Sequence, residues 1–123
     1  MTKKRIMIVE DEPMTLMNEE RMVRNLGYQV VDTALSGEVA VQRAGVIKPD
    51  LVLMDIKLMG DMDGREAALE IQKLHKIPVV FITAYGVKET SASENLTAPE
   101  GVGYIVKPFT EEELGSEIKR LIG

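Results

Sequence analysis

Residues 5–12 read RIMIVEDE, an apolar run that ends in three carboxylates, and this stretch decides how the rest of the chain is interpreted. Four more apolar runs rich in Val, Ile or Leu follow at intervals of about 25 residues, the length of one strand–helix unit. The five runs are Arg5–Glu10, Gln29–Ala34, Leu51–Met54, Pro78–Ile82 and Gly103–Val106. Their regular spacing predicts five strands that alternate with helices.

Three of the intervening segments carry apolar residues at helical spacing, so each is expected to form a helix with one apolar stripe. The stripes are Leu16, Val23 and Leu26; Ala67, Ile71 and Leu74; and Leu114, Ile118 and Leu121. The boundary residues agree with these helices: Pro13 suits a first helical position, Gly27 suits a helix exit, and Asp63 with Glu66 and Thr110 with Glu113 have the spacing of capping boxes.

Strands that alternate with helices at this spacing imply a mostly parallel sheet, because each right-handed crossover lays its helix on one face. We therefore expect an α/β domain of the (βα)5 type, with helices on both faces of a five-stranded sheet. The most polar run, Gln29–Ala34, is the candidate edge strand. Gly45 interrupts the second helix, expected over Gly37–Val46. A fourth helix over Val87–Glu100 has few apolar anchors and should be short and mobile.

The length of 123 residues corresponds to about one domain, so we take residues 1–123 as a single unit. The chain has 20 acidic and 15 basic residues and a formal net charge of -5, which argues against direct nucleic-acid binding. Its apolar runs are too short to span a membrane, and no signal peptide is recognisable. The absence of cysteine excludes disulfides and thiolate metal sites and fits a cytoplasmic protein.

Charged or reactive side chains follow four of the five predicted strands. In an open α/β sheet, ligands bind beyond the carboxyl ends of the strands, so these residues are the candidates for a site. They are Glu10 and Asp11 after the first strand, Asp55 after the third, Thr83 after the fourth and Lys107 after the fifth. Each has an ordinary alternative explanation as a helix-terminal, capping or solvated surface residue, and for Glu12 that explanation is equally good. Their joint placement favours a site.

Three carboxylates in one cleft require a positive charge. At an effective dielectric of about 20, two carboxylates ~4 Å apart repel by roughly 4 kcal/mol, so Glu10, Asp11 and Asp55 cannot all stay ionised unaided. Lys107 supplies one charge, and an oxygen-only set suits a hard cation such as Mg²⁺. A carboxylate beside Mg²⁺, with a hydroxyl and an ammonium ready to hold oxygens, is suited to accept a phosphoryl group.

Four segments, in this order, resemble the receiver domain of two-component response regulators over essentially the whole chain. They are MIVEDE (7–12), LVLMDIKLMGDMDG (51–64), VVFITAY (79–85) and YIVKPF (104–109). The resemblance implies a flavodoxin-like fold with strand order 2-1-3-4-5. It also implies that Asp55 is the phosphoryl-accepting nucleophile. The implied Mg²⁺ site is formed by Asp11, Asp55, Glu10 through water, and the backbone carbonyl of Lys57.

The same resemblance assigns the remaining residues of the site. Thr83 and Lys107 would bind phosphoryl oxygens, Thr83 and Tyr104 would change position on activation, and the Lys107–Pro108 peptide bond would be cis. The loop over residues 57–64 departs from the family pattern, because it lacks the usual proline and is one residue longer.

The implied function is a signalling switch, phosphorylated on Asp55 by a histidine kinase or a histidine phosphotransfer protein. It would act on an effector, or on a second copy, through the fourth helix, the fifth strand and the fifth helix. A small aspartyl-phosphate phosphohydrolase is one alternative, but it needs an acid where this chain has Lys57, so we do not expect an enzyme. A non-phosphorylated interaction module is the other, but it would be expected to lack Asp11, Asp55 or Lys107.

Overall fold

The computed structural model describes residues 3–56, 63–84 and 101–123. The elements in chain order are β1 (Arg5–Val9), α1 (Pro13–Asn25), β2 (Gln29–Ala34), α2 (Gly37–Ile47), β3 (Leu51–Asp55), α3 (Gly64–His75), β4 (Val79–Ala84), β5 (Val102–Lys107) and α5 (Glu111–Ile122). The predicted fourth helix, Val87–Glu100, and the predicted metal contact of Lys57 lie outside the described residues. Within the described ranges, no helix is both long and apolar enough to cross a membrane.

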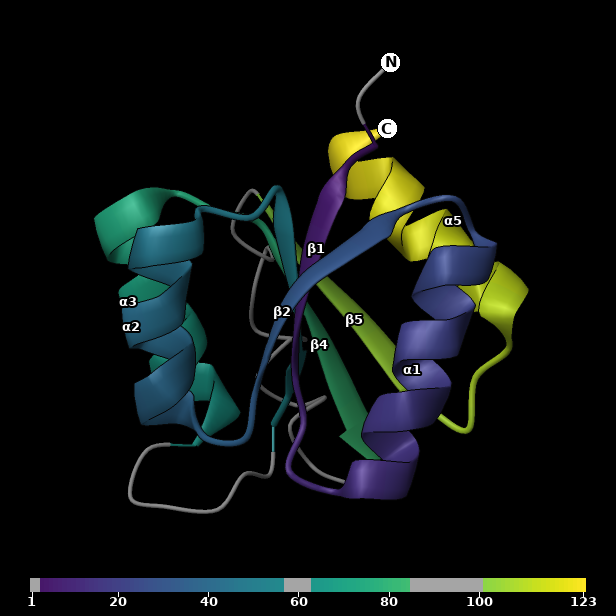
Figure 1. The fold of residues 1–123 in the computed structure, drawn as a ribbon, viewed down its shortest axis with the longest axis horizontal. Coiled ribbons are helices and arrows are strands. Elements are labelled where there is room, and N and C mark those ends of the chain that lie inside the picture. Colours follow the sequence, from purple (N-terminus) through teal and green to yellow (C-terminus); the bar gives the residue numbers. More distant parts are fainter. Residues whose placement is uncertain (1–2, 57–62, 85–100) are drawn as a thin grey trace.

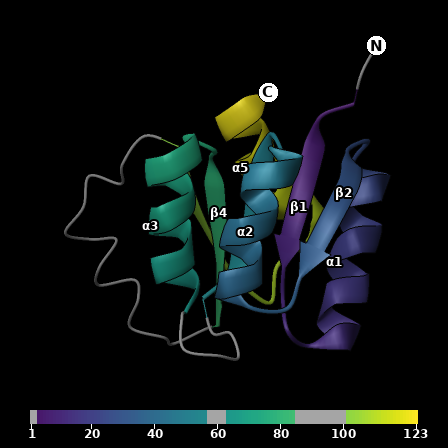
Figure 2. The same ribbon diagram turned by 60° about the vertical axis from the view of Figure 1, so that its left-hand side comes forward.

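The five strands form one parallel sheet in the order β2-β1-β3-β4-β5. This order confirms the predicted flavodoxin-like arrangement and the edge position of β2. Helices α1 and α5 cover one face of the sheet, and α2 and α3 cover the other (Figure 1). The two helical layers remain on opposite sides of the sheet when the molecule is turned (Figure 2).

Successive residues of the central strands contribute to opposite halves of the core. In β1, Ile6 and Ile8 pack in the layer of α1 and α5, whereas Met7 and Val9 pack in the layer of α2 and α3. All four are at most 1% exposed. Because β1 is covered on both faces, its sequence is a continuous apolar run rather than an alternating pattern.

The predicted side-chain caps are present at the helix starts. Both capping boxes form, with Asp63 and Glu66 opening α3 and Thr110 and Glu113 opening α5. Gly27 follows α1 with a φ of 94°, a left-handed conformation that a residue without Cβ adopts without strain. The predicted starts of α3 and α5 and the predicted end of α1 are therefore confirmed.

Helix α2 is not interrupted at Gly45, contrary to the expectation from sequence, and it continues to Ile47. A Cβ at Gly45 would lie only 3.0 Å from Nε2 of His75, at the end of α3. The close packing of α2 on α3 therefore favours a glycine at this position in spite of its low helix propensity.

The prediction for Leu74 is wrong, because its side chain is 58% exposed. The buried face of α3 is centred on Ala67, Ala68 and Ile71. Leu74 has roughly the same helical phase as Ala67, but it lies in the last turn of α3, beyond the buried residues of the helix.

Candidate functional site

Three carboxylates lie together at the carboxyl ends of two neighbouring strands. Asp55 is the last residue of β3, and Glu10 and Asp11 follow β1, which pairs with β3. Each side chain offers one oxygen, and these oxygens all lie within 4.8 Å of one another. Glu10 is 1% exposed and Asp55 is 8% exposed, whereas Asp11 is half-buried. The fold thus brings together acids that are far apart in the chain.

Two polar side chains from β4 and β5 extend this edge of the sheet. The register of the two strands places Thr83 opposite Val106 and next to the pair that contains Lys107. Thr83 is 2% exposed. Lys107 Nζ lies 3.5 Å from Glu10 Oε1, and the Lys107–Pro108 peptide bond is cis. Carboxylates, a hydroxyl and an ammonium therefore converge from the ends of four strands.

Burial and the neighbouring acids both affect the pKa of Glu10. Burial raises the pKa of Glu10 to about 7, and the neighbouring Asp55 carboxylate adds to this effect, whereas the Lys107 ammonium opposes it. Three clustered carboxylates with one ammonium would carry a surplus of negative charge when ionised. Their donor atoms are all oxygens, so the residues present fit a hard divalent cation such as Mg²⁺.

Glu12 belongs to helix α1 rather than to the carboxylate cluster. Its side chain accepts hydrogen bonds from the backbone N–H of Thr15 at 2.8 Å and from the Thr15 hydroxyl at 2.9 Å, and it caps the helix. The hydrogen bonds to Thr15 lower the pKa of Glu12. The backbone N–H of Glu12 donates to Glu10 Oε2 at 3.2 Å. Of the two interpretations that the sequence leaves open, the structure supports helix capping.

Gly64 fixes the start of α3 against the strand that carries Asp55. Its N–H donates to the carbonyl of Ile56 at 2.8 Å. A Cβ at this position would lie 2.7 Å from Ile56 Cα and would overlap the carbonyl oxygen of Asp55. Sequence reasoning missed this role, because it depends on the approach of two backbone segments.

Tyr104 lies on β5, beside the core layer of α2 and α3. Its ring stacks on Phe81 of β4, with centroids 5.3 Å apart and planes at 28°. Its backbone N–H donates to Glu117 Oε2 on α5 at 3.0 Å. Burial raises the pKa of the Tyr104 hydroxyl. The residue thus connects β4, β5 and α5.

Glu19 of α1 is a buried acid that sequence reasoning missed. It is 1% exposed, and neither carboxylate oxygen has a hydrogen-bond partner in the part of the chain that the structure describes. Burial raises the pKa of Glu19 to about 8, and the charge of Glu10 adds to this effect. Helical spacing could have identified the residue, because it lies three positions after Leu16 and four before Val23, on the apolar stripe.

Comparison with known proteins gives one consistent family. A family model described as the response regulator receiver domain matches residues 6–119. The transcriptional regulatory protein PdtaR of Mycobacterium tuberculosis is 38% identical over 111 residues, covering 90% of this chain and 53% of that protein. The phyllosphere-induced regulator PhyR of Methylorubrum extorquens is 34% identical over 118 residues, covering 95% of this chain and 43% of that protein. The chain therefore spans about half the length of these relatives.

Solved structures agree with the family match. The signal receiver domain of a modulated diguanylate cyclase from Desulfovibrio desulfuricans superposes with a TM-score of 0.86 at 32% identity, covering 98% of this chain and 94% of that one. The receiver domain of the PhyR response regulator from Erythrobacter litoralis gives a TM-score of 0.83 at 32% identity, covering 98% and 90%.

Proposed function

Because this chain belongs to the response regulator receiver domain family, we propose that it is a signalling switch that accepts a phosphoryl group on Asp55. The observation that carries the proposal is the position of Asp55. It ends β3 in a cluster of three carboxylates, beside an ammonium and a hydroxyl from neighbouring strand ends.

The proposed phosphoryl donor is a phosphohistidine of a sensor kinase or a histidine phosphotransfer protein. An Asp55 carboxylate oxygen attacks the phosphorus, and a P–O bond forms as the P–N bond to the donor histidine breaks. The imidazole leaves with the bonding electron pair, and Asp55 becomes a mixed anhydride. In this proposal, Lys107 and Thr83 would bind oxygens of the phosphoryl group during the transfer. We expect no turnover of an external substrate.

The reaction would depend on Mg²⁺ bound by Asp11 and Asp55, by Glu10 through water, and by the backbone carbonyl of Lys57. When bound, the ion neutralises the carboxylates and the charge on the transferred phosphoryl group. Glu12 and Lys107 are not proposed as metal ligands. Glu12 caps α1, and the Lys107 ammonium contacts Glu10.

The proposed output passes through β5 and α5, together with the segment between β4 and β5. Movement of Thr83 toward the phosphoryl group would alter the environment of Phe81 and Tyr104, whose rings stack across β4 and β5. The receiving partner would be an effector protein or a second copy. Direct nucleic-acid binding by this chain is not proposed, and a cytoplasmic location stays a prediction.

Intact mass measured after incubation with acetyl phosphate tests the proposal. We expect one phosphoryl group to be added in the presence of Mg²⁺, none in EDTA, and none in Asp55→Asn. Asp50→Asn is the matched control, because Asp50 lies just before β3 at its other end, where it accepts the N–H of Arg5 at 2.7 Å. Absence of modification in the parent, when an established receiver domain is modified in parallel, would leave an interaction module that has the fold but not the switch.

A further inference from the structure

Among the described strands, β5 lies at the edge of the sheet, where one row of its backbone groups has no neighbouring strand to pair with. The residues of a strand direct their N–H and C=O groups to its two sides in alternation. Since the C=O of Gly101 accepts the N–H of Val79 on β4, the backbone groups of Val102 and Tyr104 face outward. Their hydrogen-bond partners must come from outside the sheet.

Side chains of α5 supply partners at two of these outward positions. The N–H of Tyr104 donates to Glu117 Oε2 at 3.0 Å. Arg120 Nη2 donates to the C=O of Val102 at 3.4 Å and to Glu117 Oε2 at 2.8 Å, and we refer to these four residues as the edge clamp. The hydrogen bonds from Arg120 and Tyr104 lower the pKa of Glu117, so its carboxylate is ionised at neutral pH.

Gly103 lets the edge clamp form directly against β5. A Cβ at this position would lie only 2.5 Å from Glu117 Oε2, so any larger residue would displace the carboxylate. A glycine weakens a strand and commonly marks a close approach of another group to the backbone. Strand and helix are therefore fitted to each other at this point.

Tyr104 connects the edge clamp to the opposite face of the sheet. Its ring packs in the layer of α2 and α3 and stacks on Phe81 of β4, whereas its N–H is bonded by α5. Because the allowed rotamers of a side chain depend on the φ and ψ angles of its backbone, a new position of the ring favours a different backbone conformation. Movement of the Tyr104 ring would therefore change the direction of the N–H that Glu117 accepts.

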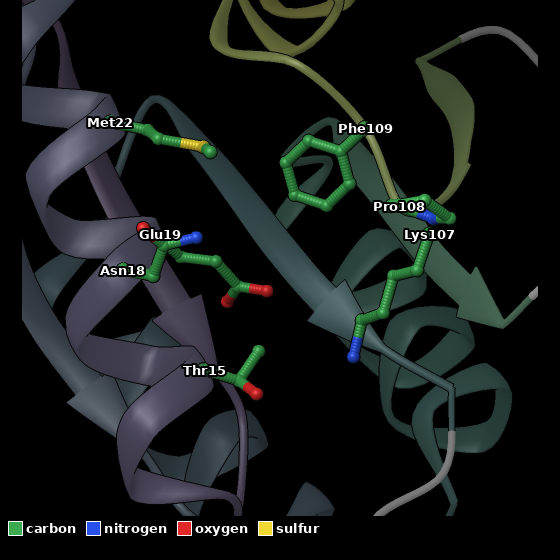
Figure 3. A pocket seen from close by; sticks show the side chains of 7 residues that line it. All are labelled: Thr15, Asn18, Glu19, Met22, Lys107, Pro108 and Phe109. Atoms are coloured by element: carbon green, nitrogen blue, oxygen red, sulfur yellow. The ribbon is translucent and has the colours of Figure 1, made fainter.

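The covalent connection from β5 to α5 is a less direct route. It runs through Pro108 and Phe109, which border a cavity of about 450 Å³ opposite α1 residues such as Glu19 and Met22 (Figure 3). Phe109 is only partly buried. Close packing transmits a displacement, whereas a chain beside open space can adjust without moving its neighbours. The edge clamp is therefore the tighter of the two connections between β5 and α5.

We propose that Glu117 is a positioning residue that transmits a change at Tyr104 to α5. This inference rests on the proposed function and names the side chain that passes the signal out of the sheet. When phosphorylation displaces the Tyr104 ring from Phe81, the Tyr104 N–H shifts. The ionised Glu117 follows it, together with Arg120 and the last turns of α5. Without Glu117, the strand and the helix respond independently.

Beryllofluoride, a phosphoryl mimic, tests this transmission at saturating Mg²⁺ in ¹H–¹⁵N and aromatic spectra. In the parent, the signals of Thr83, of the Tyr104 ring and of Leu121 in the last turn of α5 should shift. Glu117→Met keeps the length of the side chain but removes the carboxylate. The first two signals should still shift in this variant, whereas Leu121 should lose more than half of its change. The matched control is Glu112→Met, an exposed acid on α5 outside the edge clamp, and an equal loss there would overturn the proposal.

Gly103→Ala is a second way to break the edge clamp, because the added Cβ displaces the Glu117 carboxylate without changing any charge. It should also reduce the shift of Leu121. An unreduced Leu121 response in either variant would overturn the proposal, as would a parent in which Thr83 and Tyr104 respond but Leu121 does not. A parent in which beryllofluoride leaves Thr83 unchanged would instead count against the proposed function.

The edge clamp also has a readout that needs no phosphoryl group. The amide hydrogen of Tyr104 should exchange with solvent roughly three- to tenfold faster in Glu117→Met and Gly103→Ala than in the parent, as expected for the loss of one hydrogen bond. The amide of Ile105, which faces β4, should keep its rate in all three proteins. Equal exchange at Tyr104 in all three would refute the assignment of Glu117, whether or not the chain is phosphorylated.

Discussion

Asp11 and Glu12 are neighbours in the sequence, but their carboxylates serve different parts of the structure. Asp11 contributes an oxygen to the cluster with Glu10 and Asp55. Glu12 turns back to cap α1 through Thr15. The role of each acid thus depends on the groups that surround its carboxylate. Substitutions of Asp11 and Glu12 can therefore be compared to separate metal binding from helix capping.

We predict that Asp11→Asn weakens Mg²⁺ binding by roughly tenfold or more, because the substitution removes a negatively charged ligand. Glu12→Gln should bind Mg²⁺ almost as the parent does and should instead lower the stability of α1. Isothermal titration calorimetry measures both affinities. Equal losses in the two variants would contradict the assignment of Glu12 to the helix.

The stability of the metal-free protein should fall as the pH rises, because of Glu10 and Glu19. Their pKa values in the folded protein, about 7 and about 8, lie above those of an unfolded chain. Between the unfolded and folded values the folded state therefore binds more protons, and the free energy of unfolding decreases with pH. Because one pKa unit corresponds to about 1.4 kcal/mol, we expect a total loss of several kcal/mol between about pH 5 and about pH 9.

Urea denaturation in EDTA measures this dependence. Glu19→Gln should flatten the slope, since its amide does not titrate, whereas Glu20→Gln should retain it. A parent protein whose stability increases between about pH 6 and about pH 8 would show that these acids are not destabilised by burial.

At the scale of single elements, the site depends on how closely α3 approaches β3. The capping box of α3 sets the helix start, and Gly64 lets its first turn meet the backbone at Asp55 and Ile56. On the other side of the sheet, Glu117 and Arg120 of α5 bond to the backbone of β5, with Arg120 Nη2 donating to the carbonyl of Val102 at 3.4 Å. Helix α3 therefore fixes the end of β3, and α5 fixes the edge strand β5.

Gly64→Ala should lower the free energy of unfolding by roughly 1–3 kcal/mol, the usual cost of forcing extra atoms into a packed region. It should also slow phosphorylation by acetyl phosphate, because the backbone that carries Asp55 must shift. Gly115→Ala is the matched control. Its Cβ would meet Cδ2 of Leu26 at 2.7 Å, the end of a side chain that can move, and the change also raises helix propensity. Similar losses in both variants would contradict a special role for Gly64.

At the scale of the whole molecule, binding of a cation at one edge of the sheet should stabilise the entire fold. The site draws on the ends of β1 and β3, which form the centre of the core, so the unfolded chain cannot reproduce it. Mg²⁺ at ten times its dissociation constant should raise the free energy of unfolding by about 1.4 kcal/mol.

Thermal unfolding with MgCl₂, and with NaCl at equal ionic strength, checks this linkage. The control is needed because the chain has a net charge of -5, and any salt screens its self-repulsion. Asp11→Asn should respond alike to both salts. A parent protein with the same response to both salts would argue against a specific site.

The sequence by itself determined the elements and the groups at their ends. Apolar runs located all five strands, and short-range boundary signals located the starts of α1, α3 and α5, because these features depend on residues within a few positions of one another. The edge position of β2 followed from its polarity, and the acids, hydroxyl and ammonium of the site followed from the rule that strand ends face one edge. The strand order itself was implied by family resemblance.

The tertiary structure alone decided how these groups relate to one another. Burial of Glu19, exposure of Leu74, and the close approaches at Gly45 and Gly64 depend on which distant segment lies opposite, and no local pattern encodes that. The same holds for the assignment of Glu12 to a helix cap and Glu10 to the cluster, because both are acids in one short run. Local sequence specifies conformation through nearby contacts, whereas charge and solvent exposure at a site are set by the packing of the whole chain.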